Sequence, residues 1–183
     1  MSDTLLFLRE LATKPLQISA IAPSSRFLAR AMTRDIGPKT GRVVEFGPGT
    51  GVLTRGILAA GVNPADLTLF EMSAEFSAHL STTFPGVTVQ NTGAQNAANF
   101  VPKGVGAVIS GLPLMSMPPE IRESIIRAAF DVLAPAGIYV QFTYGSRAQV
   151  TPEQMKRLGL RVEQTAYVLF NLPPARVHTF RRN

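Results

Sequence analysis

The chain of 183 residues is long enough for one domain with a substantial core, and hydrophobic residues make up 45% of it. It contains no cysteine, which excludes disulfide bonds and thiolate metal sites, and its two histidines join no cluster of metal-binding residues, so no metal is expected. The net charge of +6 favours an anionic partner, and a nucleic acid or an anionic membrane surface would satisfy it. No apolar run approaches the ~20 residues of a membrane span and no signal-peptide pattern starts the chain, which predicts a cytosolic protein.

Two helices are predicted within residues 1–40, which we treat as a capping unit attached to a domain over residues 41–183. The first helix spans residues 3–13, and its wide apolar stripe is made by Leu5, Leu6, Phe7, Leu8, Leu11 and Ala12. Contact with a membrane surface and packing on the core explain this stripe about equally well. The second helix is predicted over residues 25–34, and we expect its apolar face to pack on the core: Phe27, Leu28, Ala31 and Met32.

A buried strand over residues 42–46 is predicted to lead into a glycine-rich turn and then into a helix over residues 51–60. Three glycines at alternate positions let the backbone approach a ligand, and the following helix directs its N-terminus toward it. The spacing differs from the G-x-G-x-x-G pattern of dinucleotide sites. It resembles the first motif of class I S-adenosylmethionine (SAM) methyltransferases. The resemblance implies that this cofactor lies against Glu45, Gly47, Gly49, Thr50 and Gly51, with Glu45 near its methionyl end, directly or through water.

The next two predicted strands add residues to the same site. The strand over residues 67–71 ends in Glu71, 20 residues beyond Gly51, where an acid typically binds ribose hydroxyls in nucleotide-binding sheets. Met72 follows and is expected to pack on the adenine. After a helix over residues 73–83 and a strand over residues 87–90, Gly93 and Ala94 are expected to border the adenine ring with their backbone.

The strand over residues 105–110 ends in a loop that begins Ser110-Gly111-Leu112-Pro113. In the methyltransferase fold this position faces the transferred methyl group. Enzymes that methylate nucleobase amines carry Asn or Asp, then prolines, then an aromatic ring there, whereas this chain has Ser110 and Leu114. The small, apolar loop therefore argues against a nucleobase and suits an aliphatic amine, such as that of a lipid head group.

The last third of the chain completes an alternating pattern of strands and helices. A helix is predicted over residues 119–133 and strands over residues 137–142, 161–170 and 176–182. The connection at 171–175 is too short for a crossover helix, so the last two strands are expected to pair in antiparallel fashion. The pattern predicts an α/β fold with a Rossmann-like, mostly parallel seven-stranded sheet, closed by an antiparallel hairpin. Tyr144 and Arg147 follow the fifth strand, at the edge where ligands bind in open α/β sheets.

The chain resembles the bacterial phospholipid N-methyltransferases of the SAM-dependent, membrane-peripheral kind. The resemblance extends over nearly the whole chain and rests on Pro15, Ser19-Ala20-Ile21-Ala22-Pro23-Ser24-Ser25, the glycine turn, Ser110-Gly111-Leu112-Pro113, Gln141-Phe142-Thr143-Tyr144-Gly145 and Asn171-Leu172-Pro173-Pro174-Ala175. It implies successive methylation of phosphatidylethanolamine toward phosphatidylcholine, on the inner face of the cytoplasmic membrane, with S-adenosylhomocysteine as the second product.

A phospholipid N-methyltransferase also needs residues that accept a proton and residues that bind the lipid. Tyr144, His178 and water are candidate proton acceptors for the lipid ammonium. Tyr144 and Ser110 are expected beside the reacting groups, and Ser110 is also expected to contact the cofactor. Candidate contacts for the lipid, its phosphate included, are Lys14, Ser24, Ser25, Gly111, Leu112, Tyr144 and Arg147, although Ser24 and Ser25 are also suited to cap a helix.

Two other functions share parts of the pattern. An RNA adenine dimethyltransferase has the same fold and suits the positive charge, but the loop after Ser110 and the missing C-terminal RNA-binding domain argue against it, so no nucleic-acid partner is expected. A SAM-binding, membrane-surface protein without catalysis is the third candidate. The glycine turn, Glu71 and Tyr144 together favour an enzyme over this last possibility.

Overall fold

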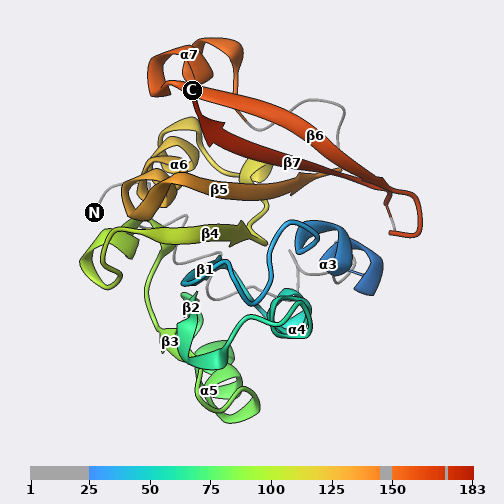
Figure 1. Ribbon diagram of the computed structural model, residues 1–183, viewed down its shortest axis with the longest axis vertical. Coiled ribbons are helices and arrows are strands. Elements are labelled where there is room, and N and C mark those ends of the chain that lie inside the picture. Colours follow the sequence, from blue (N-terminus) through green and yellow to red (C-terminus); the bar gives the residue numbers. More distant parts are fainter. Residues whose placement is uncertain (1–24, 145–149, 172) are drawn as a thin grey trace.

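The computed structural model describes residues 25–144, 150–171 and 173–183, and the described residues form one seven-stranded sheet covered by helices (Figure 1). The strands lie in the order β3-β2-β1-β4-β5-β7-β6. Neighbouring strands are parallel from β3 to β5, while β7 is antiparallel to both β5 and β6. The predicted α/β architecture is confirmed, including the closing hairpin. The strands are β1 Val43–Phe46, β2 Leu67–Phe70, β3 Thr88–Gln90, β4 Val105–Ser110, β5 Leu133–Thr143, β6 Leu160–Val168 and β7 Ala175–Arg182.

Helices cover both faces of the sheet because the strands of its parallel part alternate apolar residues between two buried layers. The helices are α3 Arg26–Met32, α4 Val52–Ala59, α5 Ala74–Thr83, α6 Pro119–Val132 and α7 Pro152–Leu158, with short 3-10 turns η1 Pro64–Asp66, η2 Ala94–Asn99 and η3 Leu114–Ser116. One apolar core joins the sheet to α3, α4 and α5, and the other joins it to α6, α7 and η2. No helix in the described ranges is long and apolar enough to cross a membrane.

The structure departs from the predicted elements at three points. Helix α7 was not predicted, although Thr151 and Gln154 form a complete capping box at its start. Strand β5 begins at Leu133 rather than residue 137, because α6 passes directly into it. In α3, Leu28 and Met32 are buried as expected, but Phe27 is 46% exposed. The helix predicted over residues 3–13 lies outside the described residues.

The strand register brings the predicted site residues to one edge of the sheet. Phe46, the last residue of β1, is level with Phe70 at the end of β2 and with Ser110 at the end of β4. Ser110 is in turn level with Gln141 of β5. The segments that follow these four strands therefore leave the sheet side by side, as ligand-binding loops do in open α/β folds.

Candidate functional site

The three glycines of the turn after β1 have different surroundings. All three adopt positive φ angles. A Cβ atom on Gly47 would come within 2.4 Å of the Leu112 side chain, and one on Gly51 within 2.5 Å of the Phe84 ring, so these two glycines permit close packing inside the protein. A Cβ on Gly49 would meet no atom within 4 Å. Gly49 is thus the glycine of the turn that faces open space, where a ligand has room to approach the backbone.

Glu71 is held directly against this open glycine. Its Oε2 accepts a hydrogen bond from the Gly49 N–H at 3.1 Å, and its Oε1 accepts one from the Ser73 N–H at 2.9 Å. Partial burial raises the pKa of Glu71, and the backbone hydrogen bonds oppose that shift. Each carboxylate oxygen keeps a further lone pair, so the fixed carboxylate remains able to accept hydrogen bonds from ligand hydroxyls.

Asn91, just beyond β3, is a site residue that the sequence reasoning missed. Its Nδ2 donates to the backbone oxygens of Glu71 at 2.9 Å and Met72 at 3.1 Å, and to the Ser77 hydroxyl at 3.1 Å. This amide therefore ties the end of β2, with its acid, to the end of β3 and to α5. An asparagine directly after the third strand, at the ligand edge, was the available signal.

The remaining residues predicted to contact the cofactor differ in their exposure. Met72 is half-buried, and Thr50 is exposed, with its carbonyl accepting a hydrogen bond from Arg55 at 3.1 Å. Gly93 directly precedes η2, and Ala94, its first residue, is buried in the core with 5% exposure. The contacts predicted between these residues and the cofactor stay predictions.

Glu45 is fully buried, and its side chain is directed toward α4. Its Oε2 accepts a hydrogen bond from the Thr54 hydroxyl at 2.7 Å, while its Oε1 has no hydrogen-bond partner within the described part of the chain. Burial raises the pKa of Glu45 to about 8, the hydrogen bond from Thr54 opposes this, and the charge of Glu71 adds to it. Glu45 is therefore mainly protonated at neutral pH, and its predicted contact with the methionyl end stays a prediction.

The loop after β4 is held against the glycine turn by buried polar residues. A Cβ on Gly111 would lie 2.8 Å from the Gly47 carbonyl oxygen, so the two backbones are in close contact. Gln141 of β5 donates from Nε2 to the Leu112 carbonyl at 2.9 Å and accepts at Oε1 from the Tyr139 hydroxyl at 2.7 Å. The sequence motif alone does not reveal this role of Gln141, because its contact with Leu112 depends on the register of β4 and β5.

Ser110 takes part in the same network from the end of β4. It is fully buried, its Oγ accepts from the Leu112 N–H at 3.4 Å, and its hydroxyl also hydrogen-bonds to Tyr139. Leu114, the position of the missing aromatic ring, is 1% exposed and belongs to the core. The side chain at that position therefore packs inside the protein.

Tyr144 lies just beyond the end of β5, half-buried, with its ring centroid 5.2 Å from that of Phe142. Burial raises the pKa of the Tyr144 hydroxyl, and its hydrogen bond with the Asn171 side chain opposes the shift. The Asn171 Oδ1 also accepts a hydrogen bond from the Ser25 N–H at 3.0 Å. This amide thus joins Tyr144 to the start of α3, where the Ser25 hydroxyl accepts from the Leu28 N–H and caps the helix.

His178, the other candidate proton acceptor, lies inside the sheet on β7, opposite Gln141. It is 5% exposed, and its Nε2 has no hydrogen-bond partner among the described residues. Burial lowers the pKa of His178, and the nearby charge of Arg176 lowers it further, so the ring is neutral near pH 7. Lys14, Ser24 and Arg147 lie outside the described residues.

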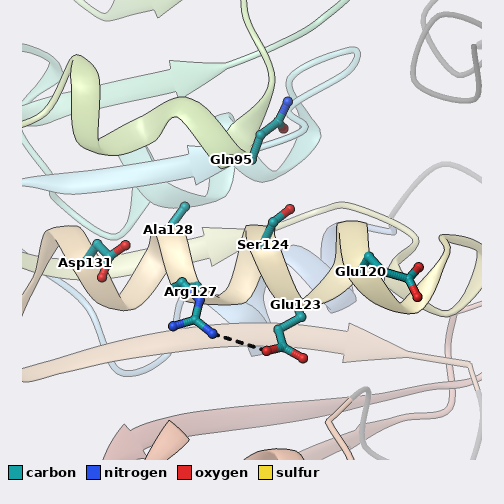
Figure 2. Close-up of a pocket in the computed structure, with 7 residues that line it drawn as sticks. All are labelled: Gln95, Glu120, Glu123, Ser124, Arg127, Ala128 and Asp131. Carbon is teal, nitrogen blue, oxygen red and sulfur yellow. Dashed lines mark hydrogen bonds and ion pairs between the residues drawn. The ribbon is translucent and has the colours of Figure 1, made fainter. Parts of the chain in front are cut away.

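A separate polar pocket runs along α6, and Figure 2 shows its side chains projecting from that helix, with Gln95 contributed by η2. Its acid Glu123 forms ion pairs with Arg127 and with Arg157 of α7. None of its lining side chains has a buried polar atom without a partner. These charges tie α7 to α6, and we assign no ligand to this pocket.

Comparison with known structures shows which class of proteins shares this fold. A TehB-like SAM-dependent methyltransferase from Corynebacterium glutamicum matches 98% of this chain and 100% of its own with a TM-score of 0.66 at 15% identity. The magnesium protoporphyrin IX methyltransferase from Synechocystis matches 100% of this chain and 98% of its own with a TM-score of 0.66 at 12% identity. A putative rRNA methylase from Clostridium thermocellum matches 88% of this chain and 98% of its own with a TM-score of 0.62 at 19% identity. The chain has the fold of class I SAM-dependent methyltransferases, and SAM is the cofactor of this class, as the sequence predicted.

Sequence comparison narrows this class further. No protein-family model matches the chain. The ornithine lipid N-methyltransferase of Singulisphaera acidiphila is 32% identical over 162 residues, which cover 78% of this chain and 79% of that protein. The chain belongs to the same family as this lipid N-methyltransferase, which confirms the resemblance found in the sequence at the level of lipid N-methylation.

Proposed function

We propose that this protein transfers methyl groups to the amine of phosphatidylethanolamine and of its methylated intermediates, toward phosphatidylcholine. The reaction takes place on the inner face of the cytoplasmic membrane, to which the protein binds peripherally. The observation that carries the proposal is the 32% identity to a lipid N-methyltransferase over most of both chains.

The described residues fit SAM as the cofactor. The open face of Gly49 and the adjoining carboxylate of Glu71 offer a place for a ribose with two hydroxyl groups. Asn91 supports this place by donating a hydrogen bond to the backbone oxygen of Glu71. When bound, SAM supplies a methyl group already activated by its positively charged sulfur. The protein's task is then to orient the amine and to exclude water, since alignment of the reacting groups supplies most of the acceleration.

The residues around the loop after β4 are suited to a small aliphatic amine. Gly111 and Leu112 form an apolar wall that Gln141 holds against the glycine turn. Tyr144 stands at the end of the adjacent strand, where its ring can orient a cationic head group and its hydroxyl can donate a hydrogen bond. Its raised pKa keeps this hydroxyl protonated near neutral pH, so it acts as an orienting or relaying group, and water removes the proton of the lipid ammonium.

A second candidate substrate is an ornithine lipid, which the name of the relative from Singulisphaera acidiphila favours. Both lipids offer a primary amine, but only phosphatidylethanolamine carries a phosphate. The two are separated by incubating the purified protein with labelled SAM and vesicles that contain one lipid or the other, with RNA as a parallel substrate. Label in phosphatidylethanolamine supports the proposal, whereas label confined to ornithine lipid or to RNA contradicts it. Vesicle binding without label in any substrate supports a non-catalytic protein.

A further inference from the structure

An exposed apolar surface lies where the β6–β7 hairpin meets α3. It consists of Phe27, Tyr167, Leu169 and Phe170, which we call the hairpin-tip patch. These are four of the six large hydrophobic side chains that are exposed within the described residues. Phe170 is 79% exposed and Leu169 is 64% exposed. The ring centroids of Phe27 and Phe170 are 5.6 Å apart, so these two rings bring α3 and the hairpin together, and Tyr167 and Leu169 lie close by in the chain at the end of the hairpin.

Two arginines lie against aromatic rings of the hairpin-tip patch. The Arg26 guanidinium lies 5.1 Å from the centroid of the Phe27 ring, and the Arg176 guanidinium lies 4.8 Å from that of Tyr167. Positions 164–177 contain no acidic residue, and the whole chain carries a net charge of +6. Exposed aromatic and aliphatic side chains with arginines beside them match the boundary of a bilayer with anionic lipids, where rings enter the acyl region and guanidinium groups remain among the head groups.

The hairpin-tip patch also adjoins the reactive end of the sheet. The loop that joins β6 to β7 lies on the side toward which β4 and β5 point, which is also the side of α3 (Figure 1). Asn171, next to Phe170 in this loop, hydrogen-bonds to both Tyr144 and Ser25. A bilayer in contact with the patch would therefore lie beside Tyr144.

We propose that the hairpin-tip patch is a membrane-contact surface that inserts into anionic bilayers and turns the site toward lipid head groups. Insertion of the patch requires no methyl transfer and is independent of the proposed function. The orientation of the site toward lipid head groups rests on that function. The patch adds a second membrane contact to the one predicted for residues 3–13.

The direct test uses the absence of tryptophan from the chain, which makes one introduced tryptophan the sole such fluorophore. Phe170→Trp in the full-length protein is mixed with vesicles of phosphatidylcholine and phosphatidylglycerol, which contain no amine substrate. We expect its emission to shift to the blue and to be quenched by bromine-labelled acyl chains. Phe100→Trp is the matched control, because Phe100 is 49% exposed and lies just after η2, away from the hairpin. Its emission should stay unchanged.

Three results would overturn the proposal. An unchanged Phe170→Trp emission on bound vesicles would show that another face meets the membrane. A blue emission without vesicles that is independent of protein concentration would mean that the chain's own N-terminal segment covers the patch. A blue emission without vesicles that depends on protein concentration would mean that a second copy of the protein covers the patch.

A loss-of-binding variant gives a second measurement. Leu169→Ser combined with Phe170→Ser should weaken partitioning onto these vesicles on the order of tenfold or more, because both side chains leave water on insertion. SAM affinity, which needs no lipid, should be unchanged and reports that the variant is folded. Undiminished vesicle binding by a folded double variant would refute the patch as an anchor. Because this assay contains no methyl acceptor, a failure of the proposed function shows instead in the labelling of the amine lipids.

Discussion

The buried carboxyl of Glu45 makes the stability of this protein depend on pH, and Glu45→Gln should remove that dependence. The pKa of Glu45 is raised from 4.5 to about 8 in the folded state, mainly by burial. The folded protein therefore binds a proton more tightly than the unfolded chain, so stability falls as pH rises from about 4.5 to about 8 and then levels off. Glutamine resembles the protonated carboxyl in shape, keeps an acceptor for the Thr54 hydroxyl, and does not ionise.

The size of the effect follows from the two pKa values. Each pKa unit corresponds to roughly 1.36 kcal/mol, so ionisation of Glu45 in the folded state costs about 5 kcal/mol. At pH 7 the folded protein keeps its proton while the unfolded chain has lost it, which costs about 3 kcal/mol. The free energy of unfolding of Glu45→Gln minus that of the wild-type protein should therefore be larger above pH 8 and at pH 7 than at pH 4.5, by these two amounts respectively.

Urea unfolding of both proteins at a series of pH values measures this difference directly. Ionisations of groups that do not interact with Glu45 affect both proteins alike and cancel when the two free energies of unfolding are subtracted. Glu75→Gln, which replaces an exposed carboxylate in the first turn of α5, controls for the substitution itself. A difference between wild type and Glu45→Gln that is the same at pH 4.5 and pH 8 would refute the reasoning.

The other predictions concern ligand binding and turnover. Glu71→Ala should weaken SAM binding at least severalfold, because the ribose loses a charged acceptor, and unchanged affinity by calorimetry in a folded variant would remove Glu71 from the site. Gly49→Ala and Gly159→Ala place a methyl group in open space at positive φ and should lose similar stability, of about 1 kcal/mol, yet only Gly49→Ala should impair SAM binding. Equal affinity in both would show that the ligand does not approach Gly49. Tyr144→Ala should lower turnover strongly with little change in SAM affinity. Near-normal activity of Tyr144→Phe would favour cation–π orientation by the ring, strong loss would favour the hydroxyl, and full activity of both variants would make Tyr144 structural.

The sequence predicted the sheet well because apolar alternation and turn residues act locally. All seven strands were expected near their observed positions, and the short connection before Ala175 correctly required an antiparallel pair. Helix α7 escaped notice because seven residues with partly exposed apolar side chains produce a weak helical period, although the capping residue Thr151 marked its start.

The site was less predictable where it depends on contacts between segments distant in the chain. The glycine turn was recognised, but its sequence does not show that Gly47 and Gly51 pack on Leu112 and Phe84 while Gly49 alone faces open space. The support of Leu112 by Gln141 likewise needs β4 and β5 in register. Local patterns thus predicted the edge of the sheet that carries the candidate site, and tertiary packing decides which of its residues remain accessible to a ligand.

Binding of SAM should also be coupled to the protonation of Glu45. SAM carries an ammonium and a sulfonium, and a cation near Glu45 would favour its ionised form and lower its raised pKa. If the methionyl end lies beside Glu45, binding near pH 7 therefore releases a fraction of a proton from the protein. Calorimetric titration with SAM in two buffers of different ionisation enthalpy measures this release, which should disappear in Glu45→Gln. Equal apparent binding enthalpies in the two buffers for the wild-type protein would separate Glu45 from the cofactor, and its carboxyl would then serve only to join β1 to α4 through Thr54.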